Sequence, residues 1–169
     1  MSAAGPVLVL VGPPGAGKTT VGTLVAQQLG VPFRDTDSDV ESAAGKAVPD
    51  IFLDDGEPLF RELERSAVTA ALSEHRGVLA LGGGAILDPR TRALLAGHRV
   101  VFLTVGLSDA AKRVGLARDR PLLSFNPRAH LRMLMEQRQP LYAEVAAVTV
   151  DTDRRSVEDV AEEVRLHAG

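Results

Sequence analysis

The stretch GPPGAGKTT, from Gly12 to Thr20, carries the most informative chemistry in this sequence. Gly12, Gly17, Lys18 and Thr19 match the pattern G-x-x-x-x-G-K-[ST]. Glycines let such a loop curl so that successive backbone N–H groups point inward, where they can hold phosphate oxygens. The lysine reaches the terminal phosphates of a nucleotide, and the threonine hydroxyl can complete a Mg²⁺ shell. The stretch therefore predicts a phosphate-binding loop.

The flanks of this loop favour the same interpretation. The apolar run Val7–Val11 precedes it and VGTLVAQQL follows it, which gives the order strand, loop, helix that the motif requires. A glycine-rich turn with an exposed lysine is the plainer alternative. A GTPase would need an N-K-x-D guanine reader, and the single Asn of the chain, Asn126, is followed by Pro127. A motor ATPase normally has an acidic residue where the third strand, VLALGGG, has Ala, Leu and Gly.

Two acidic residues, Asp35 and Asp37, flank Thr36 in the stretch DTDSD after a short apolar run. If the strand continues through them, both side chains leave on one face, at the carboxyl edge of the sheet where α/β proteins bind ligands. One carboxylate could support a metal shell through water, and the other could contact an incoming hydroxyl. Because Asp and Ser are favoured N-cap residues, these acids, including Asp39, could instead begin a helix.

Strand-like and helix-like segments alternate along the chain, which predicts an α/β fold with a parallel sheet covered by helices. The expected strands are Val7–Val11, 31–37, 78–84, 99–106 and 147–151. The expected helices are 21–30, one long amphipathic helix over 56–75, one from about Ser108, one through 130–142 and one opened by the capping residue Ser156. An Arg/Pro-rich loop is expected around 118–127.

Composition limits the classes of function. The chain has 169 residues, of which 45% are hydrophobic, as one domain with a real core requires. The net charge of −3 excludes a general attraction to nucleic acid or to an anionic membrane. No apolar run reaches the roughly 18 residues of a membrane span, and we expect a cytoplasmic protein. With no Cys, the chain has no disulfide, zinc-thiolate site or thiol nucleophile.

An ordered set of segments resembles the shikimate kinase family over nearly the whole chain. These segments are GPPGAGKTT, FRDTD, IFLDDGEPLFRELE, LGGGA, RPLL, RQPLY and DTDRR. The resemblance implies a P-loop NTPase-like three-layer sandwich with a central five-stranded parallel sheet, helices on both faces, a helical substrate-binding segment and a mobile lid. It implies one kinase domain over 1–169, with a core of 1–34, 62–112 and 128–169, a substrate-binding segment of about 35–61, and a lid of about 115–127.

The same resemblance implies the activity. Members of the family transfer the γ-phosphate of ATP to the 3-hydroxyl of shikimate, in the pathway to chorismate and the aromatic amino acids. Gluconate kinases and nucleoside monophosphate kinases share the loop and a lid, so they remain the neighbouring alternatives. A non-catalytic ATP-binding module is the alternative from a different class, and it would have no reason to keep the catalytic residues in order.

Site residues are also implied by the resemblance. The catalytic set is Asp37, Lys18 and Arg120. The ATP-binding set is Gly12, Gly15, Ala16, Gly17, Lys18, Thr19, Thr20, Arg113, Arg120 and Arg154. The substrate-binding set is Asp37, Arg61, Gly82, Gly83, Gly84 and Arg138, and the metal set is Thr19 and Asp35 for Mg²⁺.

Physical chemistry agrees with several of these assignments. Shikimate is a carboxylate with three vicinal hydroxyls, and the planar fork of arginine meets a carboxylate with two hydrogen bonds. Glu64 follows Arg61 by three residues, on the helix face where it could hold the guanidinium. Phe52 and Phe60 would pack near the ring or in the core. We expect a monomer that acts on shikimate and ATP, without nucleic-acid or membrane partners.

Overall fold

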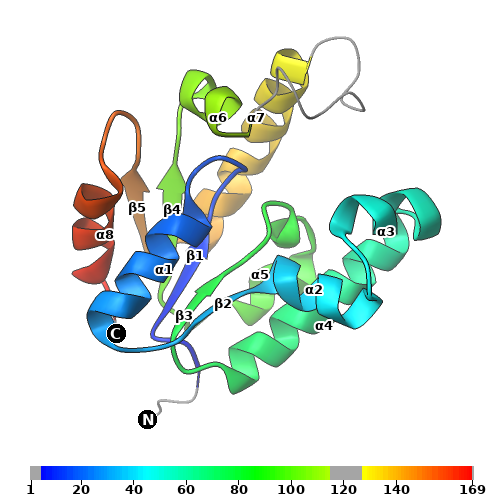
Figure 1. Cartoon of the computed structure of the whole chain (residues 1–169), viewed down its shortest axis with the longest axis horizontal. Helices are drawn as coiled ribbons and strands as arrows, with labels where there is room; N and C mark the ends of the chain where they lie inside the picture. The colour runs from blue at the N-terminus through cyan, green and yellow to red at the C-terminus, as the bar shows by residue number, and fades with distance from the viewer. Residues whose placement is uncertain (1–4, 115–126, 169) are drawn as a thin grey trace.

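The computed structural model describes residues 5–114 and 127–168, which form a five-stranded parallel sheet with the order β2-β3-β1-β4-β5 (Figure 1). The strands are β1 (Leu8–Val11), β2 (Phe33–Asp35), β3 (Val78–Ala80), β4 (Val100–Thr104) and β5 (Val148–Asp151). In the register, Leu8 lies opposite Val78, and Val9 lies opposite Val100. The predicted fold class and number of strands are confirmed.

Helices cover both faces of this sheet, as predicted. They are α1 (Lys18–Leu29), α2 (Thr36–Ala44), α3 (Val48–Asp55), α4 (Glu57–Glu74), α5 (Pro89–Leu94), α6 (Leu107–Val114), α7 (Pro127–Val145) and α8 (Val157–Arg165), with a short 3₁₀ helix, η1 (Ala85–Leu87). In Figure 1, α1 and α8 form a layer on one side of the sheet. The other face packs against α4, η1 and α7.

Alternating residues of the strands supply two separate cores. Leu8 and Leu10 of β1 pack toward the helices α1 and α8, whereas Val9 and Val11 pack toward α4 and α7. Each of these four side chains is at most 1% exposed. Because both faces of a parallel sheet are covered, its strands read as continuous apolar runs, and this is why LVLV was recognisable in the sequence.

A third, smaller core lies beside the sheet, where α2, α3 and α4 meet around Val40, Ile51 and Phe60. These helices extend from the carboxyl edge of the sheet (Figure 1). The long helix expected over 56–75 is confirmed as α4, but α2 and α3 were not predicted as separate helices. The boundary expected near residue 61, between the substrate-binding segment and the core of the single domain, falls inside α4.

Several predicted helix ends are confirmed. Gly30 ends α1 in a left-handed conformation, with φ of 69°, and its N–H bonds to carbonyls of the last turn. The Ser156 side chain caps α8 by accepting a hydrogen bond from the Asp159 N–H. Among the described residues, no helix is both long and apolar enough to span a membrane. The expected lid falls mostly on 115–126, which lie outside the described residues.

Candidate active site

The phosphate loop, Gly12–Thr20, joins the end of β1 to the start of α1. Gly15 and Gly17 have φ values of 84° and 90°, which residues with a side chain rarely adopt. Gly17 is also the residue that precedes the first turn of α1. The glycines therefore allow the tight turn, and the loop's last residues belong to a helix N-terminus, where N–H groups and the helix dipole favour an anion.

Lys18 sits within this loop, beside the acidic residues of the neighbouring segment. Its Nζ donates hydrogen bonds to the carbonyls of Gly12 at 2.7 Å and Pro13 at 3.1 Å. Removal of the ammonium from water lowers the pKa of Lys18 to about 8, while the carboxylates of Asp37 and Asp35 oppose this shift. The ammonium therefore still carries its charge at neutral pH.

Asp35 connects the phosphate loop to the acidic stretch. The Thr19 hydroxyl donates to Asp35 Oδ2 at 2.9 Å, and the Asp37 N–H donates to Asp35 Oδ1 at 2.9 Å. The expectation that the strand continues through Asp37 is wrong, because β2 ends at Asp35 and α2 begins at Thr36. Asp35 is the N-cap of α2, and this side-chain hydrogen bond stabilises the first helical turn.

Asp37, in the first turn of α2, faces the centre of the site. Its carboxylate lies so close to Gly82 that a Cβ at that glycine would collide with Asp37 Oδ1. Burial raises the pKa of Asp37 above its ordinary value, the Asp35 carboxylate raises it further, and the charges of Lys18 and Arg61 oppose both. A carboxylate in these surroundings is a candidate proton acceptor.

The glycine triplet, Gly82–Gly84, follows β3 and lets charged side chains approach the backbone. A Cβ at Gly84 would lie 2.6 Å from Arg61 Nη1, and a Cβ at Gly83 would lie 3.3 Å from the Pro14 ring. The Gly82 N–H donates to Thr36 Oγ1 at 3.1 Å, so it is not free to bind a ligand. The N–H groups of Gly83 and Gly84 donate no hydrogen bond within the described part of the chain.

Arg61 is held in place by carboxylates of its own helix. Its Nη1 donates to Glu64 Oε1 at 2.7 Å, and its Nε donates to Glu57 Oε2 at 3.2 Å. Glu64 is only 4% exposed, and burial raises its pKa while Arg61 lowers it. The Arg61 guanidinium carbon also lies 5.2 Å from the centre of the Phe60 ring. This network orients one guanidinium over the glycine triplet, as the spacing of Arg61 and Glu64 predicted.

The two phenylalanines of this segment differ in burial. Their ring centres are 4.7 Å apart, and Phe60 is 4% exposed, whereas Phe52 is 38% exposed. Phe60 therefore belongs to the small core of α2, α3 and α4. That the exposed ring of Phe52 contacts the substrate stays a prediction.

Arg138, on α7, approaches the same place from the opposite side. Its Nη1 would lie 3.7 Å from a Cβ at Gly83. Its positive charge lowers the pKa of both Lys18 and Glu64. Tyr142, one turn along, donates to the Gly83 carbonyl at 2.6 Å, and burial raises its pKa to about 12. Arg61 and Arg138 thus converge on the glycine triplet from different helices.

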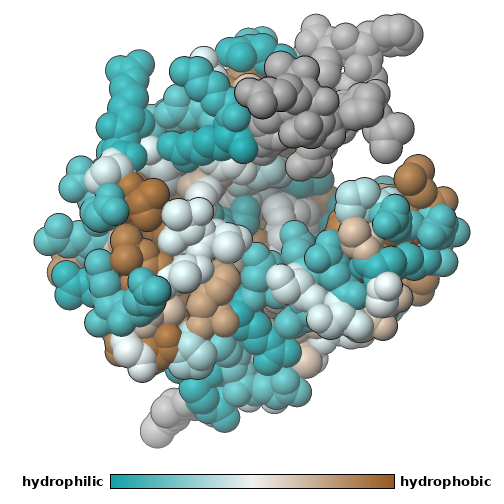
Figure 2. Space-filling model, in the orientation of Figure 1, coloured by the Kyte–Doolittle hydropathy of each residue, from teal (hydrophilic) through white to brown (hydrophobic). Residues whose placement is uncertain are grey.

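The phosphate loop and the acidic residues beside it border a central cavity of about 400 Å³. The cavity is lined by residues of the phosphate loop together with Asp35, Asp37, Gly82, Gly83 and Arg113. The face shown in Figure 2 is hollowed between the part that carries α1 and the part that carries α2 to α4. The cavity therefore brings together the phosphate loop, the acidic residues and the glycine triplet that were predicted separately.

A smaller side cavity of about 150 Å³ adjoins the phosphate loop and contains Ala16, Gly17, Thr20 and Arg113 in its lining. Arg113 Nη1 donates to the Gly15 carbonyl at 2.9 Å and to Thr152 Oγ1 at 3.2 Å. Its guanidinium therefore ties the loop to the segment between β5 and α8.

The other two arginines of the predicted ATP-binding set are Arg154 and Arg120. Arg154 is exposed and has a φ of 56°, and it does not line the side cavity. The next residue, Arg155, lines the side cavity instead. The only signal for it in the sequence was that DTDRR contains a second arginine. Arg120 lies outside the described residues.

Thr36 is the residue of this site that the sequence analysis missed. Its side chain is fully buried, and its Oγ1 accepts the Gly82 N–H. Thr36 therefore fastens the glycine triplet to the start of α2, between Asp35 and Asp37. The alternation Asp-Thr-Asp was visible in the sequence, but the partner is 46 residues away and only the folded chain reveals it.

Comparisons with known proteins agree with one another. A family model described as shikimate kinase matches residues 14–167. Shikimate kinase of Frankia casuarinae is 63% identical over 92% of this chain and 69% of that protein. Shikimate kinase of Salinispora arenicola is 61% identical over 94% of this chain and 95% of that protein. The structure of shikimate kinase from Acinetobacter baumannii in complex with shikimate has a TM-score of 0.88 and 39% identity, covering 95% and 90% of the two chains.

The Thr36–Gly82 hydrogen bond gives a test of the site's architecture. Thr36→Val keeps the shape of the side chain but leaves the buried Gly82 N–H without an acceptor. We expect the free energy of unfolding to fall by about 1–3 kcal/mol, the cost of an unsatisfied buried donor. Urea unfolding measures this change. We also expect amide hydrogen exchange at Gly82 to become faster.

Thr36→Ser is the matched control, because it keeps the acceptor and removes one methyl group, which costs about 1 kcal/mol. In this variant the protection of the Gly82 amide should stay close to that of the unmodified protein. Equal protection in Thr36→Val and Thr36→Ser would contradict the role assigned to the hydroxyl.

Proposed function

The chain belongs to the shikimate kinase family, and on this premise we propose that it transfers the γ-phosphoryl group of ATP to the 3-hydroxyl of shikimate. The observation that carries the proposal is the convergence of the phosphate loop, Asp37, Arg61 and Arg138 on one glycine triplet. An acceptor with one carboxylate and several hydroxyls matches two guanidinium groups and a nearby carboxylate.

ATP is proposed to bind along the phosphate loop, with its β- and γ-phosphates at the N-terminus of α1. Lys18 would exchange its bonds to the Gly12 and Pro13 carbonyls for the phosphates. The adenine is proposed to lie toward the side cavity, where Arg113 is placed to stack on it. The adenine contact of Arg154 and the role of Arg120 over the transferred phosphoryl group stay predictions.

Mg²⁺ is the proposed metal ion, and the residues present fit it. Thr19 and Asp35 offer a hydroxyl and a carboxylate that already lie 2.9 Å apart beside the phosphate loop. Mg²⁺ usually keeps several waters and needs only one or two protein oxygens when phosphates complete its shell. The described residues contain no group of three or more His, Asp or Glu that could hold a metal alone, which suits a metal that arrives with ATP. When bound, the ion would neutralise charge on the phosphates.

Shikimate is proposed to bind between α4, α7 and the glycine triplet. Arg61 and Arg138 would bind its carboxylate, and the N–H groups of Gly83 and Gly84 can donate to its oxygens. Asp37 would accept a hydrogen bond from the 3-hydroxyl and so aim that oxygen at the γ-phosphorus. The expected monomer stays a prediction.

Phosphoryl transfer then follows from position and charge. The bond from the 3-oxygen to the γ-phosphorus forms while the bond from that phosphorus to the β–γ bridging oxygen breaks, and the hydroxyl proton passes to the Asp37 carboxylate. Lys18 stabilises the charge that develops on the transferred group and on ADP. The expected cytoplasmic location and the expected absence of nucleic-acid partners stay predictions.

A coupled ADP-release assay tests the acceptor. Shikimate, gluconate, AMP and CMP are offered separately, each with ATP and Mg²⁺. We expect sustained turnover with shikimate alone, because its ring holds the carboxylate and the 3-hydroxyl in fixed positions, whereas gluconate is an open chain and AMP and CMP have no carboxylate. Faster turnover with gluconate or a nucleotide would overturn the assignment.

Substitution of Arg61 tests the carboxylate site. We expect Arg61→Ala to raise the KM for shikimate at least about tenfold, the effect of losing a charge-assisted hydrogen bond, while the KM for ATP changes less than about twofold. Arg65→Ala is the control, because Arg65 lies one turn further along α4 and pairs with Glu62 and Asp88. Equal weakening of both substrates by Arg61→Ala would contradict the role.

The low pKa of Lys18 predicts a pH dependence. The ammonium form binds phosphate, so kcat/KM for ATP should be constant below about pH 7 and fall as the pH rises through the Lys18 pKa of about 8. In Lys18→Arg the guanidinium stays charged over the whole pH range of the assay. The kcat/KM of this variant should be low but should not fall near pH 8. A wild-type profile that stays flat to about pH 9.5 would show that Lys18 remains protonated.

A further inference from the structure

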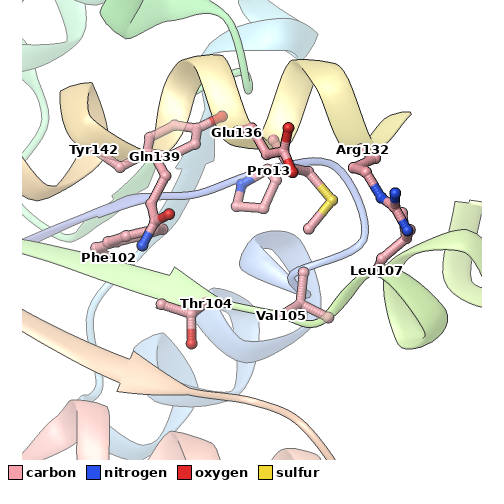
Figure 3. A pocket seen from close by; sticks show the side chains of 10 residues that line it. Pro13, Phe102, Thr104, Val105, Leu107, Arg132, Glu136, Gln139 and Tyr142 are labelled. Atoms are coloured by element: carbon pink, nitrogen blue, oxygen red, sulfur yellow. The ribbon is translucent and has the colours of Figure 1, made fainter. Parts of the chain in front are cut away.

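A cavity of about 340 Å³, here called the α7 cavity, lies between α7 and β4 (Figure 3). It shares no lining residue with the central cavity or with the side cavity. It is therefore separate from the places proposed for ATP and shikimate, and nothing in the phosphoryl-transfer mechanism uses it.

The inner wall of the α7 cavity is apolar and aromatic. Phe102 of β4 and Tyr142 of α7 have ring centres 5.0 Å apart, with a tilt of 34° between their planes. Met135 and Pro13 complete this wall. Binding cavities for small molecules commonly have such a lining, with a few polar groups that fix orientation, and an aromatic ring fits it well.

The outer wall of the α7 cavity is polar and open to solvent. Arg132, Glu136 and Gln139 of α7 line it, and all three are exposed. Figure 3 shows Arg132 and Gln139 extending from α7 toward β4, with Glu136 between them along the helix. Within 5–114 and 127–168, none of the three side chains makes a hydrogen bond or an ion pair.

We propose that the α7 cavity binds a small molecule that has an aromatic ring and a zwitterionic head group. The ring would lie against Phe102, Met135 and Pro13. Arg132 would bind the carboxylate and Glu136 the ammonium, one helical turn apart, so that a head group with both charges matches the wall better than either charge alone. This site is additional to the proposed phosphotransferase activity and does not depend on it.

Two hydrogen bonds connect the α7 cavity to the central cavity. The Pro13 carbonyl accepts from Lys18 Nζ at 3.1 Å, and the Tyr142 hydroxyl donates to the Gly83 carbonyl at 2.6 Å. A molecule in the α7 cavity would therefore touch one residue that holds Lys18 and one that holds the glycine triplet.

Titration calorimetry of the full chain measures binding without any turnover. A negative result would therefore count against the α7 cavity alone and not against the proposed kinase activity. L-phenylalanine is the probe. L-alanine lacks the ring, phenylacetate lacks the ammonium, and phenethylamine lacks the carboxylate. We expect L-phenylalanine to bind with one site per chain and the other three to bind at least about tenfold more weakly, since each lacks one recognised group.

Variants locate the binding. Arg132→Gln and Glu136→Gln should each weaken L-phenylalanine about tenfold, and Met135→Trp should abolish binding by filling the cavity. Arg165→Gln, on α8 across the sheet, is the control and should bind normally. Retained kinase activity would report that each variant folds. No heat with L-phenylalanine at about 10 mM, or unchanged binding in both Arg132→Gln and Met135→Trp, would overturn the proposal.

Discussion

The candidate active site depends on the close approach of charged side chains to the backbone of Gly82–Gly84. A Cβ at Gly84 would meet Arg61 Nη1 at 2.6 Å, and one at Gly82 would meet Glu64 Oε2 at 3.1 Å. Only glycine allows such contacts without displacing the side chains. Because β3 lies between β2 and β1, its glycine triplet emerges between the acidic end of β2 and the phosphate loop of β1. Sheet order thus places residues from distant segments in one cavity.

Burial sets the electrostatics of this cavity. Burial disfavours the charged form of acidic and basic groups alike. It therefore lowers the pKa of Lys18 and raises the pKa values of Asp37 and Glu64. Neighbouring opposite charges reduce these pKa shifts, as Arg61 does for Glu64. Such a cluster is already oriented before substrates arrive, and preorganised charges of this kind stabilise a transition state more effectively than mobile water does.

Much of this arrangement could be predicted from the sequence. Apolar runs gave all five strands, the G-x-x-x-x-G-K-T pattern gave the phosphate loop, and family resemblance indicated Arg61 and Arg138. The helices α2 and α3 were missed because they have only nine and eight residues, and because 31–37 was interpreted as a strand that continues through Asp37. The bond from Gly82 to Thr36 was missed because strand register determines it. Arg155, and not Arg154, lines the side cavity. This depends on the backbone angles of the loop, such as the positive φ of Arg154, which no local sequence pattern specifies.

A crystal structure with shikimate and a non-hydrolysable ATP analogue would test the proposed geometry of the site. We expect the shikimate carboxylate to lie between Arg61 and Arg138, with its 3-hydroxyl within hydrogen-bond distance of Asp37 and facing the γ-phosphate on the loop. A ring bound away from the glycine triplet, or a different hydroxyl beside Asp37, would contradict it.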